Sequence, residues 1–485
     1  MKNKVDLWHG RLKKQLNKST VDYLNCINDD VRLFEIDINV IKTHCKMLNR
    51  QKYMSGRNLH KIISVLEKLR NDYNSGKINI LNLAKKYSFT DIHPIIEKYV
   101  IDACGMDIGG ITNLGKSRND QVMTDVRIYL AIETKIISAV LLNLIRTLLI
   151  TAEKHIDTIL PGYTHMQPGQ ATTFAHYLLS HADIFLRSYT KLQETYTRIN
   201  LNPLGACAIA GTTINIDRNY TTVLLGFDAL AENSMDAVSS RDFILELASE
   251  LAIIMTALSR MAEDLIIWST PEFGFIELAD ELCDTSTAMP QKKNPSTMEL
   301  LRGKTATVIG ALTELFTIIK GLPTGYNQDL QQMKPAIWRI IDIIKPSIEL
   351  VSLALSTAKT NRNNMLNSAE LNFTTAIDLA EYLTEKQYLS FRQSHFLTGE
   401  LVKNMASKKS NFANYNIDGI QSLIKGLGKK LFNKTINIPA NELAKVLNPA
   451  TSILRKKGAG SPAPAQVRRM LYTRLKNINE ILQKR

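Results

Sequence analysis

A pair of lysines at residues 292–293 lies between Pro290 and Pro295, just after a group of hydroxyl-bearing residues that includes Ser286. Proline lacks an amide donor and disfavours helix in the residue before it, so this segment is expected to be a loop. A helical pattern follows at residues 298–320. Lysine charge and the unpaired amides of a helix N-terminus both favour a bound anion. The segment therefore predicts an anion-binding loop, with a solvated surface loop as the alternative.

A second group of reactive or charged side chains stands where a long helical pattern begins, at residues 121–155. Arg118 and Asn119 directly precede that pattern, and a guanidinium together with first-turn amides can hold a carboxylate. The alternative is an ordinary N-cap, in which Asn119 or Asp120 accepts hydrogen bonds from those amides.

A third segment, residues 161–168, begins and ends with proline and presents His165 shortly before the helical pattern at residues 172–200. Imidazole is the side chain whose ordinary pKa best suits proton transfer near neutral pH. The segment therefore predicts a loop that carries a candidate general acid or base. A structural histidine near a helix start is the alternative.

The spelling of these three segments resembles the argininosuccinate lyase family of the fumarase/aspartase superfamily, whose members eliminate fumarate from succinyl compounds. The first segment contains QKKNP, the second SRNDQ followed by TDVR, and the third THMQP. The resemblance extends from Trp8 to the turn at Gly458 and is densest at residues 117–334. Further matching segments lie at residues 8–11, 30–48, 91–93, 203–212, 216–218, 233–242 and 326–334.

The resemblance implies roles for the side chains that match the family motifs. Ser286 takes the place of the catalytic base, Lys292 that of the lysine that stabilises the substrate carboxylate, and His165 that of the general acid or part of its relay. Glu299 would orient the imidazole of His165. The implied substrate contacts are Ser117, Arg118, Asn119, Thr164, Arg241, Asn294, Tyr326, Gln331 and Lys334, with Asn113 and Thr287 as further candidates whose roles stay open.

The implied reaction cleaves the C–N bond of argininosuccinate to give arginine and fumarate through a carbanion. Lys292, the loop amides and Asn294 would stabilise the charge that develops on the carboxylate. A serine hydroxyl is a weak base, so Ser286 would need neighbouring positive charge and a loop that closes to expel water. His165 would protonate the departing nitrogen directly or through water. This chemistry needs no metal and no organic cofactor.

Five positions depart from the family pattern. The family usually has Gly at His9 and at Thr285, His-Thr at residues 113–114, and Arg at Lys116. Asn113 can form hydrogen bonds but cannot carry a proton, and Thr285 would stiffen a loop that must close. These departures keep a non-catalytic structural or binding relative open as an alternative. A sister lyase that acts on adenylosuccinate, aspartate or malate is the other, although QKK and residues 326–334 favour argininosuccinate.

Composition limits the class of protein. The chain has 485 residues, of which 45% are hydrophobic, and a formal net charge of +14. Its basic clusters are mild and lack interleaved aromatic residues, which favours small anionic substrates over nucleic acid. Five cysteines without CxxC spacing predict reduced thiols and no metal site. Charges interrupt the apolar stretch 128–150, which argues against a membrane span, and the lack of an apolar leader predicts a cytoplasmic protein.

The segments that must position these residues are predicted to be long helices. Residues 121–155 contain neither Gly nor Pro and would form a helix about 50 Å long at 1.5 Å per residue. Similar patterns cover residues 172–200, 239–268, 298–320 and 336–360. The sequence therefore predicts an all-α protein with an N-terminal helical domain (1–109), an elongated central bundle (110–360) and a C-terminal helical domain (361–485).

The apolar stripes of these helices are wider than one bundle can cover, which predicts burial between chains. The resemblance implies a homotetramer with two-fold axes through the helical core. It also implies that the Asn119, His165 and Ser286 regions at each active site come from three different chains.

Overall fold

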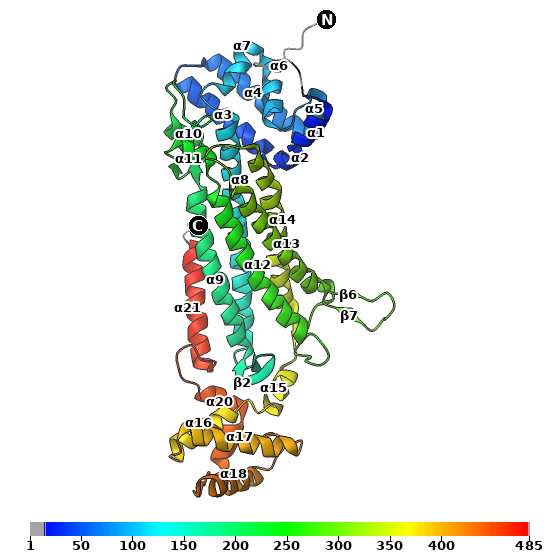
Figure 1. The fold of residues 1–485 in the computed structure, drawn as a ribbon, viewed down its shortest axis with the longest axis vertical. Helices are drawn as coiled ribbons and strands as arrows, with labels where there is room; N and C mark the ends of the chain where they lie inside the picture. The colour runs from blue at the N-terminus through cyan, green and yellow to red at the C-terminus, as the bar shows by residue number, and fades with distance from the viewer. Residues whose placement is uncertain (1–13, 15, 484–485) are drawn as a thin grey trace. The chain divides into compact units, whose positions relative to one another are not determined.

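The computed structural model describes residue 14 and residues 16–483 (Figure 1). Helices dominate this part of the chain, and all of its strands belong to two-stranded sheets. The all-α class is therefore confirmed. The matching segment at residues 8–11 lies outside the described residues.

Five long helices form the largest elements. They are α8 (Arg118–Lys154), α9 (Phe174–Ile199), α12 (Asp242–Trp268), α13 (Ser296–Ile319) and α14 (Met333–Thr357). Each begins and ends within three residues of the bounds expected from the sequence, because breaker-free apolar periodicity is a strong helix signal. By length and composition alone, α8 is the one helix among the described residues that could cross a membrane, but 56% of its most apolar stretch is buried inside the protein, as in a core helix.

Shorter helices precede, connect and follow the long ones. Before α8 come α1 (Lys18–Leu24), α2 (Ile27–Asp30), η1 (Val31–Leu33), α3 (Phe34–Arg50), α4 (Gly56–Asn74), α5 (Ile80–Tyr87), α6 (His93–Cys104), α7 (Met106–Gly109) and η2 (Gly110–Asn113). The connecting helices are α10 (Arg218–Leu225), α11 (Ser234–Ser239), η3 (Asp280–Leu282) and η4 (Gln328–Gln332). After α14 come α15 (Arg362–Leu371), α16 (Ala376–Lys386), α17 (Phe391–Ser407), α18 (Ile417–Phe432), α19 (Ala440–Leu447), α20 (Pro449–Arg455) and α21 (Pro464–Gln483).

The strands pair locally or at the ends of helices. β1 (Ile159–Thr164) pairs antiparallel with β2 (Gln167–Thr173), and β6 (Asp284–Thr285) pairs antiparallel with β7 (Lys293–Asn294). β3 (Leu201–Asn202) runs parallel to β4 (Ala229–Leu230), and β5 (Ile276–Glu277) runs antiparallel to β8 (Lys359–Thr360).

The β1–β2 hairpin corrects the prediction of an irregular loop at residues 161–168. Its ladder shifts register between Pro161 and Tyr163, and Pro168 lies opposite Tyr163. In a two-stranded sheet both strands are edges, so a proline need not supply a ladder amide on its outer side. The prolines that indicated a loop therefore lie within a hairpin.

The described residues form two compact units, each assembled from distant segments. The first draws on the described residues up to Ser138, on Thr190–Ile253 and on Ala306–Ile344, and the second on Ala139–Tyr189, Ile254–Thr305 and the described residues from Lys345 onward. Each of the five long helices contributes residues to both units. The division into three domains at residues 109 and 360 stays a prediction.

Polar contacts join the long helices within each unit. In the first unit Gln193 of α9 donates to Ser138 of α8 (3.0 Å). In the second unit the hydroxyls of Thr147 on α8 and Ser352 on α14 lie 2.8 Å apart. Their cores are aliphatic stripes, such as the buried leucines at 141, 144, 148 and 149 of α8. Helices α16–α19 add a separate hydrophobic cluster that includes Leu383, Leu397, Leu401, Ile424 and Leu443.

Candidate active site

In the first unit, the start of α8 is fixed by the buried carboxylate of Asp120. Its Oδ1 accepts the amide of Ser117 (2.9 Å), and its Oδ2 accepts the amides of Gly205 and Cys207 (2.8 Å each). Burial raises the pKa of Asp120 to about 6 although these three bonds oppose the shift. Asp120 lies in the first turn of α8, and the amide of Asn119 donates to Ser117 Oγ (3.3 Å). The N-cap interpretation is therefore wrong for Asp120, whose carboxylate instead holds the 203–211 loop against the start of the helix.

The same loop lies within reach of Asn119, whose Nδ2 donates to the carbonyl of Ala208 (3.2 Å). Gly205 has φ +88, and a Cβ there would lie 2.7 Å from Ile216 and 2.8 Å from Arg218. Only glycine accommodates both that backbone and that contact. The small residues of this segment thus allow the loop to pack closely against the helix that carries Arg118 and Asn119.

Arg118 and Lys334 are each held by a buried carboxylate. Arg118 Nη1 pairs with Asp91, which is 3% exposed, while more than half of the arginine side chain stays accessible. Lys334 pairs with Asp30, and this lysine is itself only 5% exposed. Cys26 donates its thiol proton to the second oxygen of Asp30 (3.3 Å). The two cations that are predicted to bind substrate are therefore each oriented by an ion pair with a buried carboxylate.

Tyr326 and Gln331 lie beside these cations. Gln331 Nε2 donates to the Tyr326 hydroxyl (2.9 Å). Burial raises the pKa of Tyr326, and the charges of Lys334 and Arg118 act in the opposite direction, which indicates their proximity. Gln331 Oε1 is buried and has no hydrogen-bond partner in the described part of the chain. A buried acceptor without a donor is costly, so this oxygen calls for an N–H group from a ligand or for a water.

Arg241 lies near Tyr326, whose charge acts to raise the pKa of this arginine. Its Nη1 donates to the carbonyls of Val238 (2.9 Å) and Ser240 (2.8 Å), which end α11. Burial lowers the pKa of Arg241 to about 10. An open cavity of about 440 Å³ lies between α11 and the loop before η4, a size typical of small-molecule sites.

Beneath this group runs a buried hydrogen-bond network centred on His93. Its Nδ1 lies 2.9 Å from Asp37 Oδ2 and 3.8 Å from Asp125 Oδ2. Burial alone would lower the pKa of His93, but the carboxylates of Asp37, Asp91 and Asp30 together raise it. His93 therefore lies among the same carboxylates that hold Arg118 and Lys334.

The hydrogen-bond network extends to Asn113 and Lys116, two positions at which this sequence departs from the family pattern. Gln121 Nε2 donates to Asp37, and Lys116 Nζ donates to Gln121 and to the side-chain oxygen of Asn113. Asn113 and Lys116, two residues that differ from the family pattern, are therefore bonded to each other. Nothing in the sequence indicated this pairing.

Apart from Glu299 on α13, the second described unit carries the other predicted residues on two projecting segments, the β1–β2 hairpin and the Ser286 segment. His165 and Met166 form the two-residue turn of the β1–β2 hairpin, with φ +54 and +58, and Thr164 pairs with Gln167 across it. Both φ values are typical of a type I′ turn, which normally requires Gly or Asn. Two non-glycine residues in the left-handed region store strain, a property typical of functional sites. His165 is exposed at this tip.

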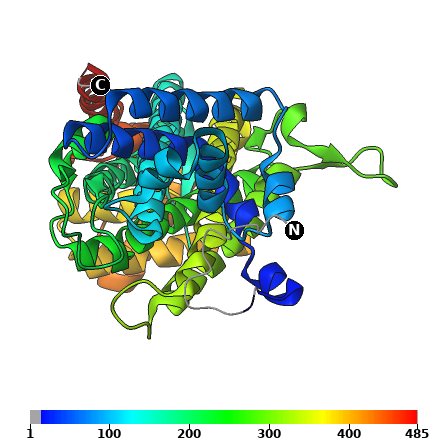
Figure 2. The ribbon, with the colours of Figure 1, turned by 90° about the horizontal axis from the view of Figure 1, so that it is seen from above.

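The Ser286 segment is an exposed arm that extends from β6 and returns through β7 (Figures 1 and 2). Ser286 Oγ accepts the amides of Ala288 (3.3 Å) and Met289 (3.1 Å). Donors aimed at a hydroxyl oxygen stabilise its deprotonated form. Thr287 and Lys292 are exposed on the arm.

The base of the arm is held by side-chain contacts. Asn294 donates to Asp284 (3.0 Å), and Lys293 pairs with Asp280 (2.7 Å) and Glu277 (3.2 Å). The departing residue Thr285 donates to the carbonyl of Lys292 (3.3 Å), which adds a bond across the ladder that glycine would lack.

Glu299 lies in the first turn of α13, where its carboxylate is 4.0 Å from Arg302. Among the described residues of this unit, no hydrogen bond or ion pair joins Glu299, Ser286 and His165 to one another. The expected pairing of Glu299 with His165 stays a prediction.

Comparison with known proteins places the chain. A lyase family model matches residues 11–310, and a model for the C-terminal region of argininosuccinate lyases matches residues 373–453. Argininosuccinate lyase of Methanosarcina barkeri is 39% identical over 468 residues, which cover 96% of this chain and 92% of the relative. The enzyme of Acetivibrio thermocellus is 42% identical and covers 82% and 85% of the two chains.

Solved structures show the same fold. EDDS lyase in complex with formate superposes with a TM-score of 0.84 at 26% identity, covering 92% of this chain and 86% of that one. The 3-carboxy-cis,cis-muconate lactonizing enzyme of Pseudomonas putida gives a TM-score of 0.73 at 18% identity, covering 92% and 95%. The length and identity of the sequence matches, together with motif residues that converge around Tyr326, show that this chain belongs to the argininosuccinate lyase family.

Proposed function

We propose that this chain cleaves argininosuccinate to arginine and fumarate. The observation that carries the proposal is the convergence of the partly exposed Arg118 and Tyr326 with the buried Lys334 and the unpartnered Gln331 Oε1. Cations suit carboxylates of the substrate, and the free amide oxygen suits an N–H donor of its arginine half. The QKKNP loop and the family membership of the chain support the same substrate.

In the proposed reaction, Ser286 removes a proton from the carbon next to a substrate carboxylate. The amides of Ala288 and Met289, which point at Ser286 Oγ, and the charge of Lys292 favour the alkoxide that this step needs. The electron pair left on carbon is delocalised into the carboxylate, near Lys292 and Asn294, and then expels the nitrogen to form the double bond of fumarate. His165 supplies the proton that the departing guanidino nitrogen takes up.

We further propose a cytoplasmic homotetramer whose sites combine residues from different chains. Support comes from α13, where Met298, Leu301 and Val308 are buried while Leu300 and Ile309 are 61% and 47% exposed. Ile132 and Ile136 of α8 and Phe316 of α13 are likewise more than 40% exposed. Apolar surface of this extent on central helices is typical of a face that another chain covers.

Release of fumarate, followed by its ultraviolet absorbance, tests the function. Argininosuccinate should be converted, whereas adenylosuccinate, aspartate and malate should not, and Ser286→Ala should lose several orders of magnitude in turnover with little change in substrate affinity. Release of fumarate from one of the other compounds instead would identify a sister lyase. Absence of turnover with all four would leave a binding or structural relative.

A further inference from the structure

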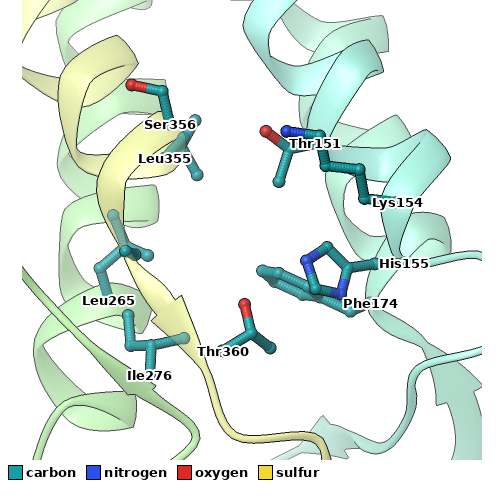
Figure 3. A pocket seen from close by; sticks show the side chains of 10 residues that line it. Thr151, Lys154, His155, Phe174, Leu265, Ile276, Leu355, Ser356 and Thr360 are labelled. Atoms are coloured by element: carbon teal, nitrogen blue, oxygen red, sulfur yellow. The ribbon is translucent and has the colours of Figure 1, made fainter.

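A second, smaller cavity lies in the other described unit, at the ends of α8 and α14 (Figure 3). Its volume is about 90 Å³, and it is bounded by residues of α8, α9, α12, α14, β5 and β8. None of its lining residues is a predicted catalytic or substrate-binding residue. A space of this volume suits only a small ligand.

One wall of this cavity carries polar side chains. Figure 3 shows the Lys154 ammonium, the Thr151 hydroxyl and a ring nitrogen of His155 facing the space, with the Thr360 hydroxyl at its lower edge. Within the described residues, no hydrogen bond or ion pair engages the side chains of Lys154, Thr151 or Thr360. Four potential donors therefore converge on the cavity, and one of them is a cation.

The charge around His155 is positive. Its Nδ1 lies 3.0 Å from Thr158 Oγ1, and in the tautomer whose Nδ1 accepts that hydroxyl proton, Nε2 donates into the cavity. Burial, followed by the charges of Arg362 and Lys154, lowers the pKa of His155 to about 4. Arg362 also donates to the carbonyl of Lys154 (2.8 Å), so it offsets the partial negative charge at the end of α8.

The opposite wall is apolar. Leu265, Ile276 and Leu355 line it, each at most 5% exposed, and the buried ring of Phe174 lies beside His155 on the first wall (Figure 3). A ligand that satisfies both walls needs an anionic end to meet Lys154 and His155 and a short hydrocarbon body to meet these side chains.

We propose that this cavity binds a small aliphatic monocarboxylate and that its occupancy influences both projecting segments. His155 and Phe174 flank the β1–β2 hairpin, and the amide of Phe174 donates to the carbonyl of Thr158 (2.8 Å) at its root. Ile276 pairs with Thr360 in the β5–β8 sheet, from which the chain continues through η3 to the Ser286 arm. A ligand here touches the roots of the segments that carry His165 and Ser286.

Ligand-observed saturation-transfer NMR with butyrate on the full-length protein tests the binding. A ligand of about six heavy atoms should bind on the order of millimolar Kd. We expect Lys154→Met to weaken butyrate binding at least tenfold, Lys154→Arg to retain it, and Ala358→Leu to abolish it by filling the space. Lys403→Met, which removes an exposed lysine on α17, is the matched control and should bind as the unaltered protein does.

Saturating fumarate should leave the butyrate signal in place, and 1-butanol should bind at least tenfold more weakly because it lacks the charge. Equal binding by Lys154→Met and the unaltered protein, complete displacement by fumarate, or equal binding of 1-butanol would each overturn the proposal.

The effect on catalysis rests on the proposed function and is measured separately. Butyrate should change kcat at saturating argininosuccinate in the unaltered protein and in Lys403→Met, but not in Ala358→Leu. If the chain has no lyase activity, the binding measurements still decide whether the cavity takes a carboxylate. If butyrate binds and kcat stays constant, the link between the cavity and the two segments is wrong.

Discussion

Lys334 and Asp30 form a buried ion pair that joins residues 304 positions apart in the sequence. The lysine is 5% exposed and the aspartate 0%. A buried pair contributes little net stability when it is intact, but removal of one partner leaves an uncompensated charge in the interior. The pair is therefore both a structural element and the support of a proposed substrate contact.

The two roles can be separated by a double substitution. Asp30→Asn should destabilise the protein by about 3–5 kcal/mol and abolish turnover, because Lys334 stays charged without its partner. Asp30→Asn combined with Lys334→Met should recover most of the thermal stability but none of the activity. Recovery of activity in the double variant, measured by fumarate release, would show that Lys334 does not bind substrate.

The contribution of His93 to the stability of the folded protein should depend on pH. The carboxylates around it raise its pKa in the folded protein above the ordinary value of 6.5, so the folded state holds the proton more tightly than the unfolded chain. This contribution is fully present below pH 6.5 and is lost as pH rises through the folded pKa. The melting temperature of His93→Gln should therefore fall furthest below that of the unaltered protein at pH 5.5 to 6.5 and approach it at higher pH.

His44 provides a control of opposite sign. Burial and the Lys116 charge lower its pKa to about 3, while its Nε2 lies 2.8 Å from the Leu114 carbonyl. Because the unfolded chain takes up this proton near pH 6.5 and the folded protein does not, stability is lost as pH falls below 6.5. His44→Gln should show a shallower decline between pH 6.5 and 4. Parallel pH curves for the two variants and the unaltered protein would contradict both assignments.

Asn113→His should lower turnover by about tenfold, which corresponds to about 1.4 kcal/mol of lost positioning. Asn113 Oδ1 accepts a hydrogen bond from Lys116, which also donates to Gln121, and an imidazole so near an ammonium is disfavoured in its charged form. Steady-state kinetics at several pH values measure the effect. A rise in fumarate release would show that residue 113 acts on the substrate directly.

Mixing of inactive variants tests the shared site. His165→Asn and Ser286→Ala proteins, denatured together and renatured, should recover activity at about a quarter of sites, because each region is drawn independently from either variant. Each variant renatured alone is the control. If folded mixed tetramers stay as inactive as their parents, His165 and Ser286 come from one chain.

The backbone geometry of the turn at His165 and Met166 predicts the order of thermal stability among variants of Met166. Met166 has φ +58, a conformation that costs about 1–3 kcal/mol for a side chain without special tolerance. Thermal melting should rank Met166→Gly at least as stable as the unaltered protein and Met166→Val below both, because β-branched residues tolerate positive φ least. A more stable Val variant would argue against the type I′ geometry.

The sequence predicted the long helices well, because α8 and α12 bury broad apolar stripes over many turns without a breaker. The hairpin at His165 was missed because its prolines indicated a loop and its turn lacks Asn-Gly or Asp-Gly, the usual signal. Tyr326, Gln331 and Lys334 could be proposed as substrate-binding residues because the sequence of their segment matches a family motif. Their carboxylate partners could not be assigned, since Asp30 and Asp91 meet Lys334 and Arg118 only through tertiary packing.

The exposed arm between β6 and β7 makes Ser286 vulnerable to proteolysis. Lys292 and Lys293 offer two trypsin sites in an extended, accessible segment, and proteases prefer such segments. A cut there would separate Ser286 from Asn294 while leaving the long helices intact. If a neighbouring chain covers the arm, or if the arm closes over bound product, trypsin should cleave it more slowly. The rate of tryptic cleavage would therefore measure the fraction of the protein that is assembled into oligomers or has product bound.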